Sequence, residues 1–393
     1  MKILYQSRID LYDPKGGDTI QMEKTKNAVE KIDPSIKIDI VTDLKAKNIN
    51  DYDLVHLFNL DWVCETYLQA LWAKQHGKKI VLSAIHHSED EVKLYESKYK
   101  FDIRRIYNLV FTSQPLRDEW KNIYRSIFNI KKLYPTIIQI LGGIRNLQRD
   151  ILTLSDAVLV QTEKEAEDIE KDFGFKVENW HKIVNGVDVD VFKNADNSKF
   201  IDLVKQKSGV NLDGKKIILN VGRIEPRKNQ LSLIQAFKNL KKRHYLDDYY
   251  LVFIGAFSKY SPEYKLRFNW NLKSKKSQII YLGPQPHNYV ASAMSHPGIY
   301  VHPSWFETTG LVALEALVSG MKVVISGDRA KEYLGELADY CNPDNIRSIE
   351  YAILEAVKRQ SPSQQQVEDI SKSYNWDETA KQTIKVYKEL FEK

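Results

Sequence analysis

One stretch of the chain, GIYVHPSWFETTGLVALEALVSGMKVVIS at 298–326, constrains the fold more than any other. It begins with a short apolar run typical of a buried parallel strand, and a polar loop follows at 302–309. Leucines then recur at helical spacing, with Thr308 or Thr309 placed to cap the helix start and Gly320 placed to end it. A second apolar run closes the unit. Strand, loop, helix and strand in this order predict an α/β fold with a parallel sheet.

Two carboxylates lie in this unit, Glu307 in the loop and Glu315 about one turn into the helix. Ligands of open α/β sheets bind beyond the carboxyl ends of the strands, where helix N-termini direct free N–H groups outward. The pattern therefore places Glu307 at a ligand site and Glu315 at its edge. The alternative is that they are ordinary surface carboxylates, one of which complements the helix dipole.

The other apolar runs repeat this alternation and predict two domains. At 393 residues the chain is too long for one hydrophobic core. Short strands separated by helical patterns indicate doubly wound parallel sheets. The predicted strands lie at 2–6, 36–41, 54–58, 80–83, within 152–162, and at 182–184, 217–221, 249–254, 279–282, 299–301 and 323–325. We expect an N-terminal domain at 1–190 and a C-terminal domain at 191–374, with the polar stretch at 188–215 as a linker.

The composition excludes several classes of protein. Hydrophobic residues make up 43% of the chain, which is a globular and not a disordered composition. Cys64 and Cys341 lie far apart and give neither a disulfide framework nor the spacing of a metal site. The N-terminus lacks the apolar region of a signal peptide, and no apolar run approaches the roughly 20 residues of a membrane span. We therefore expect a cytoplasmic protein, and we expect no nucleic-acid partner.

Positive charge is concentrated in one segment, 93–150, which contains twelve Lys and Arg residues against five Asp and Glu. Such a surplus predicts an anionic partner, either a membrane surface or a polyanion. Within the segment, basic residues flank an aromatic helical face: Trp120, Lys121, Tyr124, Arg125, Phe128, Lys131 and Lys132. This pattern fits peripheral attachment at the inner face of the plasma membrane, and it also fits a helix that covers its own core.

Two places in the N-terminal half carry candidate binding residues. Gly16 and Gly17 form a loop between a strand and a helix, where backbone N–H groups can approach a phosphate. The full fingerprint G-x-G-x-x-G is absent, so a nicotinamide cofactor is not supported, and an ordinary tight turn is the alternative. His86 and His87 follow a strand end and are candidates for a polar site. No third ligand at a suitable spacing supports a metal there.

In the C-terminal half, the loop after the strand at 217–221 holds Arg223 and Lys228. Two cations on a rigid loop beside a helix N-terminus predict a diphosphate site. The alternative is a solvated basic loop, because exposed Lys and Arg are common on protein surfaces.

Three motifs together resemble one family. GRIEPRKN at 222–229, PSWFETTGLVALEALVSG at 303–320 and NGVDVDVF at 185–192 are similar to motifs of the retaining, GT-B-fold glycosyltransferases of family 4. With the glycine pair of the first loop, the strand-tip histidines and YNWDETAKQTIKVYKEL at 374–390, the similarity covers nearly the whole chain. Two glutamates eight residues apart, combined with the Arg-Lys loop, make the resemblance specific.

The resemblance implies the GT-B architecture, two Rossmann-like domains that face a central cleft and bind a nucleotide-sugar donor. In that case Arg223 and Lys228 would bind the diphosphate and Glu315 the ribose. Glu307 would contact the donor sugar, and His86 would face it from the N-terminal domain. The remaining donor contacts implied are Gly16, Gly17, Thr308, Thr309, Gly310 and Leu311.

Two features depart from the family pattern. The family often has Glu-Gly-Phe-Gly where this chain has Glu-Thr-Thr-Gly at 307–310, which indicates a different donor-sugar pocket. Many members have one His followed by Asp where this chain has His86, His87 and Ser88, so either histidine is a candidate.

The resemblance also implies that the last helix, at about 375–393, packs back on the first domain.

We therefore predict a retaining, metal-independent glycosyltransferase without a cofactor, with Glu307, His86, Arg223 and Lys228 as catalytic residues. Its acceptor would be a hydroxyl of a glycan or of a lipid-linked molecule, in bacterial cell-surface polysaccharide synthesis. Fixed cations and helix amides can stabilise the leaving diphosphate without a metal. A nucleotide-sugar epimerase of the same fold is one alternative. A non-catalytic polyanion-binding protein is another, although it gives the two glutamates no purpose.

Overall fold

The structure is a computed structural model, and its described residues form two compact units. The first unit combines Met1–Glu89, the described part of Arg104–Gly186 and the C-terminal segment that begins at Trp376. The second contains Val187–Asn375 and a short segment that begins at Asp90. The described residues are 1–12, 16–98, 133–273, 278–307 and 310–392.

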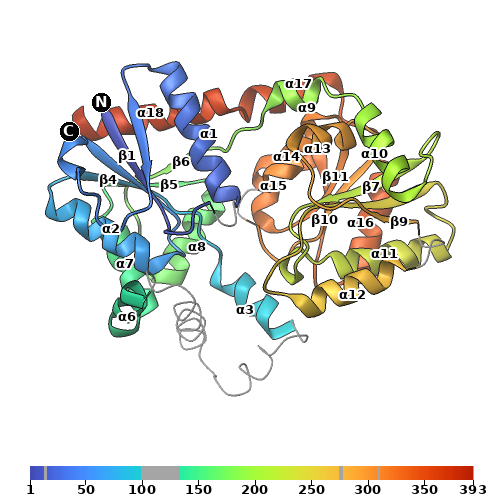
Figure 1. The fold of residues 1–393 in the computed structure, drawn as a ribbon, viewed down its shortest axis with the longest axis horizontal. Helices are drawn as coiled ribbons and strands as arrows, with labels where there is room; N and C mark the ends of the chain where they lie inside the picture. Colours follow the sequence, from blue (N-terminus) through green and yellow to red (C-terminus); the bar gives the residue numbers. More distant parts are fainter. Residues whose placement is uncertain (13–15, 99–132, 274–277, 308–309, 393) are drawn as a thin grey trace. The chain divides into compact units, whose positions relative to one another are not determined.

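A parallel sheet of six strands forms the centre of the first unit, as far as its residues are described (Figure 1). The strands are β1 (Lys2–Gln6), β2 (Lys37–Val41), β3 (Leu54–Phe58), β4 (Lys79–Ser83), β5 (Ala157–Val160) and β6 (Trp180–Lys182). Their order in the sheet is β2-β1-β3-β4-β5-β6. Alternate residues of a strand point to opposite faces, so each buried strand supplies two cores. In β3, Val55 and Leu57 enter one core, and Leu54 and Phe58 enter the other.

Helices cover both faces of this sheet. One face carries α1 (Gly17–Ile32) and α18 (Trp376–Glu392), and the other carries α2 (Val63–Gln75), α7 (Ile144–Leu154) and α8 (Glu163–Phe173), with η1 (Ile49–Asp51) as a short turn. The last helix is fixed to the sheet by buried polar groups. The Tyr387 hydroxyl lies 2.9 Å from the Tyr5 hydroxyl and 2.6 Å from His56 Nδ1. Burial lowers the pKa of His56 to about 3, so this histidine is neutral.

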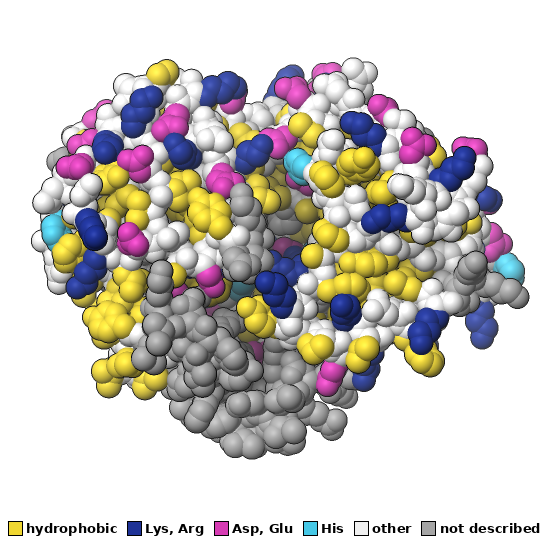
Figure 2. All heavy atoms as spheres, viewed as in Figure 1, with side chains coloured by type: hydrophobic (Ala, Val, Ile, Leu, Met, Phe, Trp, Pro, Cys, Tyr) yellow, Lys and Arg dark blue, Asp and Glu magenta, His cyan; other side chains and the backbone are white. Residues whose placement is uncertain are grey.

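The first unit also has an exposed apolar helix, α6 (Leu133–Gly142). Pro135 lies in its first turn, where a missing N–H costs little. Tyr134, Ile137 and Leu141 share one face of the helix, and all are exposed, Leu141 by 80%. Hydrophobic side chains gather over α6 in the space-filling view (Figure 2). No helix in the described ranges is long and apolar enough to cross a lipid bilayer.

The second unit is built on another parallel sheet, with six strands among its described residues. These are β7 (Lys216–Val221), β8 (Tyr249–Ile254), β9 (Ile279–Tyr281), β10 (Gly298–His302), β11 (Lys322–Ser326) and β12 (Ala338–Cys341). The order is β12-β11-β10-β7-β8-β9, so β7 and β10 are neighbours although they are far apart in the chain. This adjacency positions the site described below.

Helices cover both faces of the second sheet as well. One face carries α9 (Val189–Lys193), α10 (Ser198–Ser208), α13 (His287–Met294), α14 (Leu311–Val318), α15 (Asp328–Leu334) and α17 (Gln364–Ser373). The other carries α11 (Gln230–Lys242), α12 (Pro262–Leu272) and α16 (Ile346–Lys358). This unit also contains two short turns, η3 (Pro226–Lys228) and η5 (Gly335–Leu337). The helix α3 (Glu89–Lys98) belongs to it from Asp90 onward.

The predicted linker at 188–215 is wrong. That stretch forms α9 and α10, and Phe192, Phe200 and Val204 from these helices are buried in the core. Three apolar anchors so widely spaced among polar residues give a weak helical pattern, which is why the sequence indicated a linker. The two units divide at Gly186, immediately before this segment.

Candidate functional site

The candidate site lies at the carboxyl ends of β7 and β10 in the second unit. Because these strands are neighbours, the loops that follow them meet. The carbonyl of Arg227, in the first loop, accepts from the backbone N–H of Trp305 at 2.9 Å and from the Ser304 hydroxyl at 3.2 Å. These contacts fix the loop of Arg223 and Lys228 against the loop of Glu307.

A glycine at the end of β8 lets the Arg223 loop take its path. Gly255 has a φ of +148°, and a Cβ there would lie 1.9 Å from the carbonyl oxygen of Gly222. Side chains other than glycine are therefore excluded by both conformation and space. The close approach allows the Ile224 N–H to donate to the Ala256 carbonyl at 2.8 Å, which holds the base of the loop.

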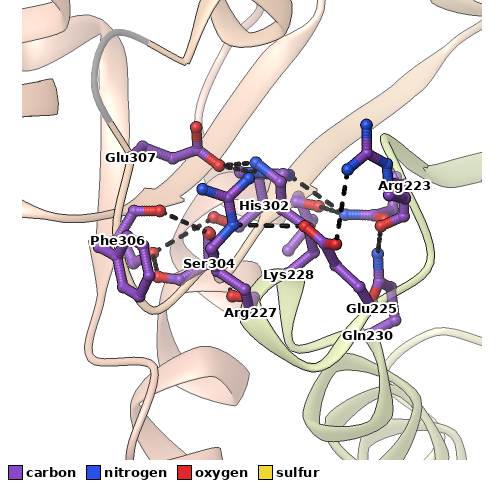
Figure 3. Close-up of polar contacts among 12 residues, drawn as sticks. Arg223, Glu225, Arg227, Lys228, Gln230, His302, Ser304, Phe306 and Glu307 are labelled. Atoms are coloured by element: carbon purple, nitrogen blue, oxygen red, sulfur yellow. Dashed lines mark hydrogen bonds and ion pairs between the residues drawn. The ribbon is translucent and has the colours of Figure 1, made fainter. Parts of the chain in front are cut away.

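Lys228, His302 and Glu307 form the polar centre of the site (Figure 3). Glu307 Oε1 accepts from Lys228 Nζ and from His302 Nε2, the latter at 2.8 Å. The three side chains are largely buried. Glu307 Oε2 makes no hydrogen bond or ion pair with another described residue, and Figure 3 shows it pointing away from the cluster. One carboxylate oxygen is thus held and the other is presented.

The protonation states of this cluster follow from burial and from the neighbouring charges. Burial opposes the ionisation of Glu307, yet Lys228 and the hydrogen bond from His302 outweigh it and hold the pKa of this carboxyl well below its usual range. Burial lowers the pKa of Lys228 despite the opposing effect of Glu307. Burial lowers the pKa of His302, and the charge of Lys228 lowers it further. Glu307 is therefore the anion of the cluster and His302 is neutral.

Arg223 lies on the same loop in a more open position. Its side chain is 37% exposed, and its Nη1 is 3.9 Å from Glu225 Oε2. Gln230, the first residue of α11, donates from its side chain to the Arg223 carbonyl at 2.9 Å. The structure thus places both predicted cations at one strand end, with Lys228 buried and Arg223 accessible.

Glu315 is held by a histidine that the sequence did not single out. Its Oε1 is 3.1 Å from Nε2 of His287, the first residue of α13. The other ring nitrogen of His287 lies 3.7 Å from Asp188 Oδ2. Glu315 and Glu307 flank the start of α14, one on the helix and one on the loop before it.

Gly310 occupies the cap position of α14, so the predicted cap by a threonine is corrected. Its φ of +45° favours glycine, and a Cβ there would lie 2.9 Å from the Tyr333 hydroxyl. Leu311 is the first residue of the helix and is half-buried. Thr308 and Thr309 lie outside the described residues, and their predicted donor contacts stay predictions.

In the first unit His86 is enclosed. It is 3% exposed, with Nδ1 at 2.7 Å from Asp61 Oδ1 and Nε2 at 3.0 Å from Asp172 Oδ2. Burial would lower the pKa of His86, but the two carboxylates outweigh it and raise this pKa to about 10. His86 therefore carries a positive charge that ties the loops of Asp61 and His86 to the end of α8. This arrangement favours a positioning role, and the predicted role opposite the donor sugar stays a prediction.

The predicted glycine loop lies at the start of α1. Gly16 is the cap residue with an extended backbone, and Gly17 is the first residue of the helix. The Thr19 N–H donates to the side chain of Asp18 at 2.9 Å, and Arg8 Nε donates to the same carboxylate at 3.1 Å. The helix start therefore already holds an anion and its counter-charge, and the expected approach of its backbone N–H groups to a phosphate stays a prediction.

Sequence reasoning missed His302 and His287. His302 had a detectable signal, since it is the last residue of a buried strand whose following loop carries Glu307. His287 gave none, because its role depends on the packing of α13 beside α14. Among the described residues, no group of three or more His, Cys, Asp or Glu side chains is arranged to hold a metal ion.

Comparison with known sequences gives a family match for the second unit. Residues 203–374 match the family described as glycosyl transferases group 1. The D-inositol 3-phosphate glycosyltransferase of Xylanimonas cellulosilytica is 25% identical over 248 residues, which are 61% of this chain and 58% of that protein. The O-antigen chain mannosyltransferase B of Escherichia coli is 26% identical over 181 residues, 44% of this chain and 45% of that protein. The chain thus spans about half the length of the curated relatives it matches.

Solved structures resemble the chain over its whole length. HepE of Anabaena, in complex with UDP, has a TM-score of 0.69 at 13% identity and covers 99% of this chain and 100% of its own. Sucrose-phosphate synthase of Thermosynechococcus elongatus has a TM-score of 0.68 at 15% identity, covering 100% and 99%. At these identities the likeness shows the fold alone. The predicted fold, GT-B with two Rossmann-like domains, is confirmed.

Proposed function

Because the second unit carries a glycosyl transferases group 1 domain on a GT-B fold, we propose that this chain is a retaining glycosyltransferase. It would move a sugar from a nucleotide-sugar donor to a hydroxyl of a glycan or lipid-linked acceptor. The observation that carries the proposal is the meeting of Lys228 and Glu307 at the carboxyl ends of two neighbouring parallel strands. A polysaccharide context is supported by the similarity to an O-antigen chain mannosyltransferase.

The donor is proposed to be a nucleoside diphosphate sugar. HepE was solved with UDP and with UDP-glucose, and its fold resembles that of this chain, which supports a donor of this class. Arg223 and Lys228 would face the diphosphate, and Glu315 would bind the ribose at the helix start. UDP is therefore the first probe to use.

The chemistry follows from the charges that develop. As the anomeric C–O bond breaks, positive charge grows on the sugar and negative charge grows on the diphosphate. Lys228, Arg223 and the N–H groups at the start of α14 would stabilise the leaving diphosphate, and fixed donors of this kind supply a large part of catalysis. Glu307 Oε2 would accept a hydrogen bond from a hydroxyl of the donor sugar. We propose front-face transfer, with the leaving phosphate taking the acceptor's proton, and no requirement for a metal.

An assay of nucleoside diphosphate release tests this function. Release from UDP-glucose, UDP-galactose or GDP-mannose should rise when an acceptor is added, and the anomeric configuration of the product should match that of the donor. Release of a free epimerised donor without an acceptor would show an epimerase instead. Thermal shift with UDP, GDP and ADP should identify the base, since a ligand that binds the folded state raises its stability. No shift with any of them would contradict the proposal.

The acceptor side is proposed to work at an anionic membrane surface. The exposed apolar face of α6 directly follows Lys131 and Lys132 in the sequence, and each basic residue near an anionic surface contributes about 1 kcal/mol. The basic and aromatic residues at 120–132 lie outside the described residues. Support for the proposal therefore comes from α6 and from the charge of the sequence.

Co-sedimentation with vesicles tests the membrane proposal. Wild-type protein should pellet with phosphatidylglycerol vesicles at low salt and be released as salt screens the charges. Changing Ile137 and Leu141 to Gln should reduce binding without unfolding, because both side chains are exposed. The charge-reversed variant of Lys121, Arg125, Lys131 and Lys132 to Glu should not bind. Wild-type protein that stays in the supernatant would contradict the membrane proposal.

A further inference from the structure

His302 has a defined hydrogen-bonding pattern on both ring nitrogens. Its Nε2 lies 2.8 Å from Glu307 Oε1 and 3.5 Å from Lys228 Nζ, and its Nδ1 lies 3.5 Å from the side-chain nitrogen of Asn220. Asn220 is itself fully buried and its Nδ2 donates to the Val301 carbonyl at 2.7 Å. Rotating that amide would place its oxygen against the carbonyl oxygen, so the N–H₂ group must face His302.

This orientation determines where the proton of His302 is. A protonated Nδ1 would point its hydrogen at the N–H₂ group of Asn220, so Nδ1 carries none. A neutral imidazole then carries its proton on Nε2, and this N–H donates to Glu307 Oε1 at 2.8 Å, which lies closer to Nε2 than the Lys228 ammonium does. Burial and the charges of Lys228 and Arg227 favour the neutral form of His302, and they outweigh Glu307, which favours the protonated form. The Tyr300 ring stacks on the imidazole.

We infer that His302 is a positioning residue, a neutral imidazole whose Nε2–H fixes one oxygen of Glu307 so that the other is presented to the donor sugar. The inference rests on the proposed function for the identity of the ligand. Lys228 alone would hold Glu307 only loosely, because an ammonium on a flexible stem accepts many geometries. The His302 ring is buried and stacks on Tyr300, so its position is restricted, and its hydrogen bond transmits that position to the carboxylate.

Two matched variants test the role. His302→Gln places an amide N–H₂ near the position of Nε2, whereas His302→Asn places it near the position of Nδ1. Gln should keep kcat within about threefold of wild type, and Asn should lower kcat by roughly 10- to 100-fold, the range for losing a hydrogen bond to a charged group. KM should change little in either. The donor is the nucleotide-sugar that wild type turns over among UDP-glucose, UDP-galactose and GDP-mannose. Equal rates for the two variants would overturn the inference.

A second measurement does not depend on turnover. In ¹⁵N-histidine-labelled protein, the resonance that disappears in His302→Gln is that of His302. Its shifts should show a bare Nδ1 and a protonated Nε2 from pH 6 to pH 8, without UDP. A protonated Nδ1, or titration within this range, would overturn the inference. Failure of every donor assay with the expected resonance present would instead count against the proposed function alone.

Discussion

Both units carry a buried histidine bound to carboxylate at the carboxyl ends of their strands, yet the two clusters are opposites. In the first unit, His86 lies between two carboxylates, Asp61 and Asp172. In the second, one carboxylate, Glu307, is shared by His302 and Lys228. The first arrangement uses both ring nitrogens on anions and so keeps the histidine charged. The second leaves the histidine neutral and one carboxylate oxygen accessible.

The difference shows that the ratio of carboxylates to cations, and not the residue type, sets what such a cluster can do. Two anions around one imidazolium satisfy one another and leave nothing for a ligand, which suits a structural tie. A single anion with two donors on one oxygen keeps its other oxygen for a ligand. This reasoning supports the proposal that the second cluster binds a ligand and that the first holds the segments around it in its own unit.

The largest effect is expected from breaking the first cluster. His86→Gln leaves Asp61 and Asp172 without their cation, and losing a partner of a buried pair costs about 3–5 kcal/mol. We expect the lower end for the free energy of unfolding, because Asp61 is 30% exposed. Since the folded pKa of His86 is raised to about 10, its contribution is complete below the unfolded value of about 6.5 and is lost as pH rises toward 10.

Urea unfolding of wild type and His86→Gln at pH 6, 8 and 9.5 measures this, and the difference should shrink as pH rises. His76→Gln is the control, since that half-buried ring contacts Trp72 and a backbone carbonyl. If His86→Gln unfolds like wild type but loses turnover, His86 acts on the donor as the family resemblance implies. That result would contradict the structural role given to the first cluster.

Substitutions in and beside the second cluster should lower the rate of turnover. Lys228→Ala should lower kcat/KM by roughly 10²–10³, the scale for removing one electrostatic stabiliser of the leaving group. Arg223→Ala should have a smaller effect, because the more exposed guanidinium is screened by water. Lys358→Ala, which removes an exposed lysine from α16, is the control. Near-normal rates for both site variants would rule out the diphosphate assignment.

The two glutamates should separate kcat from KM. If Glu307 faces the reacting sugar as proposed, Glu307→Gln removes that anion, and kcat should fall more than KM rises. If Glu315 binds the ribose as proposed, Glu315→Gln weakens a contact present in both ground and transition states, and KM should rise with kcat nearly unchanged. Steady-state kinetics with varied donor concentration measures kcat and KM separately and so distinguishes the two roles. Identical signatures would mean that at least one role is misassigned.

The smallest effect is expected at His287. His287→Ala removes the side chain that holds Glu315, and losing one ordinary hydrogen bond should raise KM for the donor by roughly two- to tenfold. His244→Ala provides the matched control, because the side chain of that histidine is exposed and hydrogen-bonds to Asp247, outside the site. A change in kcat at unchanged KM would place His287 in the chemical step instead.

Much of this molecule could be predicted from short-range pattern. Buried parallel strands are continuous apolar runs, and nearly every predicted run became a strand within a residue or two, as at 54–58 and 249–254. The loops that follow them could also be predicted to carry polar residues at the sheet edge, so Glu307, Arg223 and Lys228 were singled out as candidates. Where anchors are sparse, as in α9 and α10, the same reasoning predicted a linker and was wrong.

What only the tertiary structure decided is which residues meet. Lys228 and Glu307 are 79 positions apart, and they touch because the sheet places β7 beside β10. The sequence shows His302 at a strand end and His86 at another. It does not show that His302 lies between a carboxylate and an amide, or that His86 lies between two carboxylates. Periodicity specifies which face of an element is buried, but the charge of a buried side chain depends on partners that only the order of the strands brings within reach.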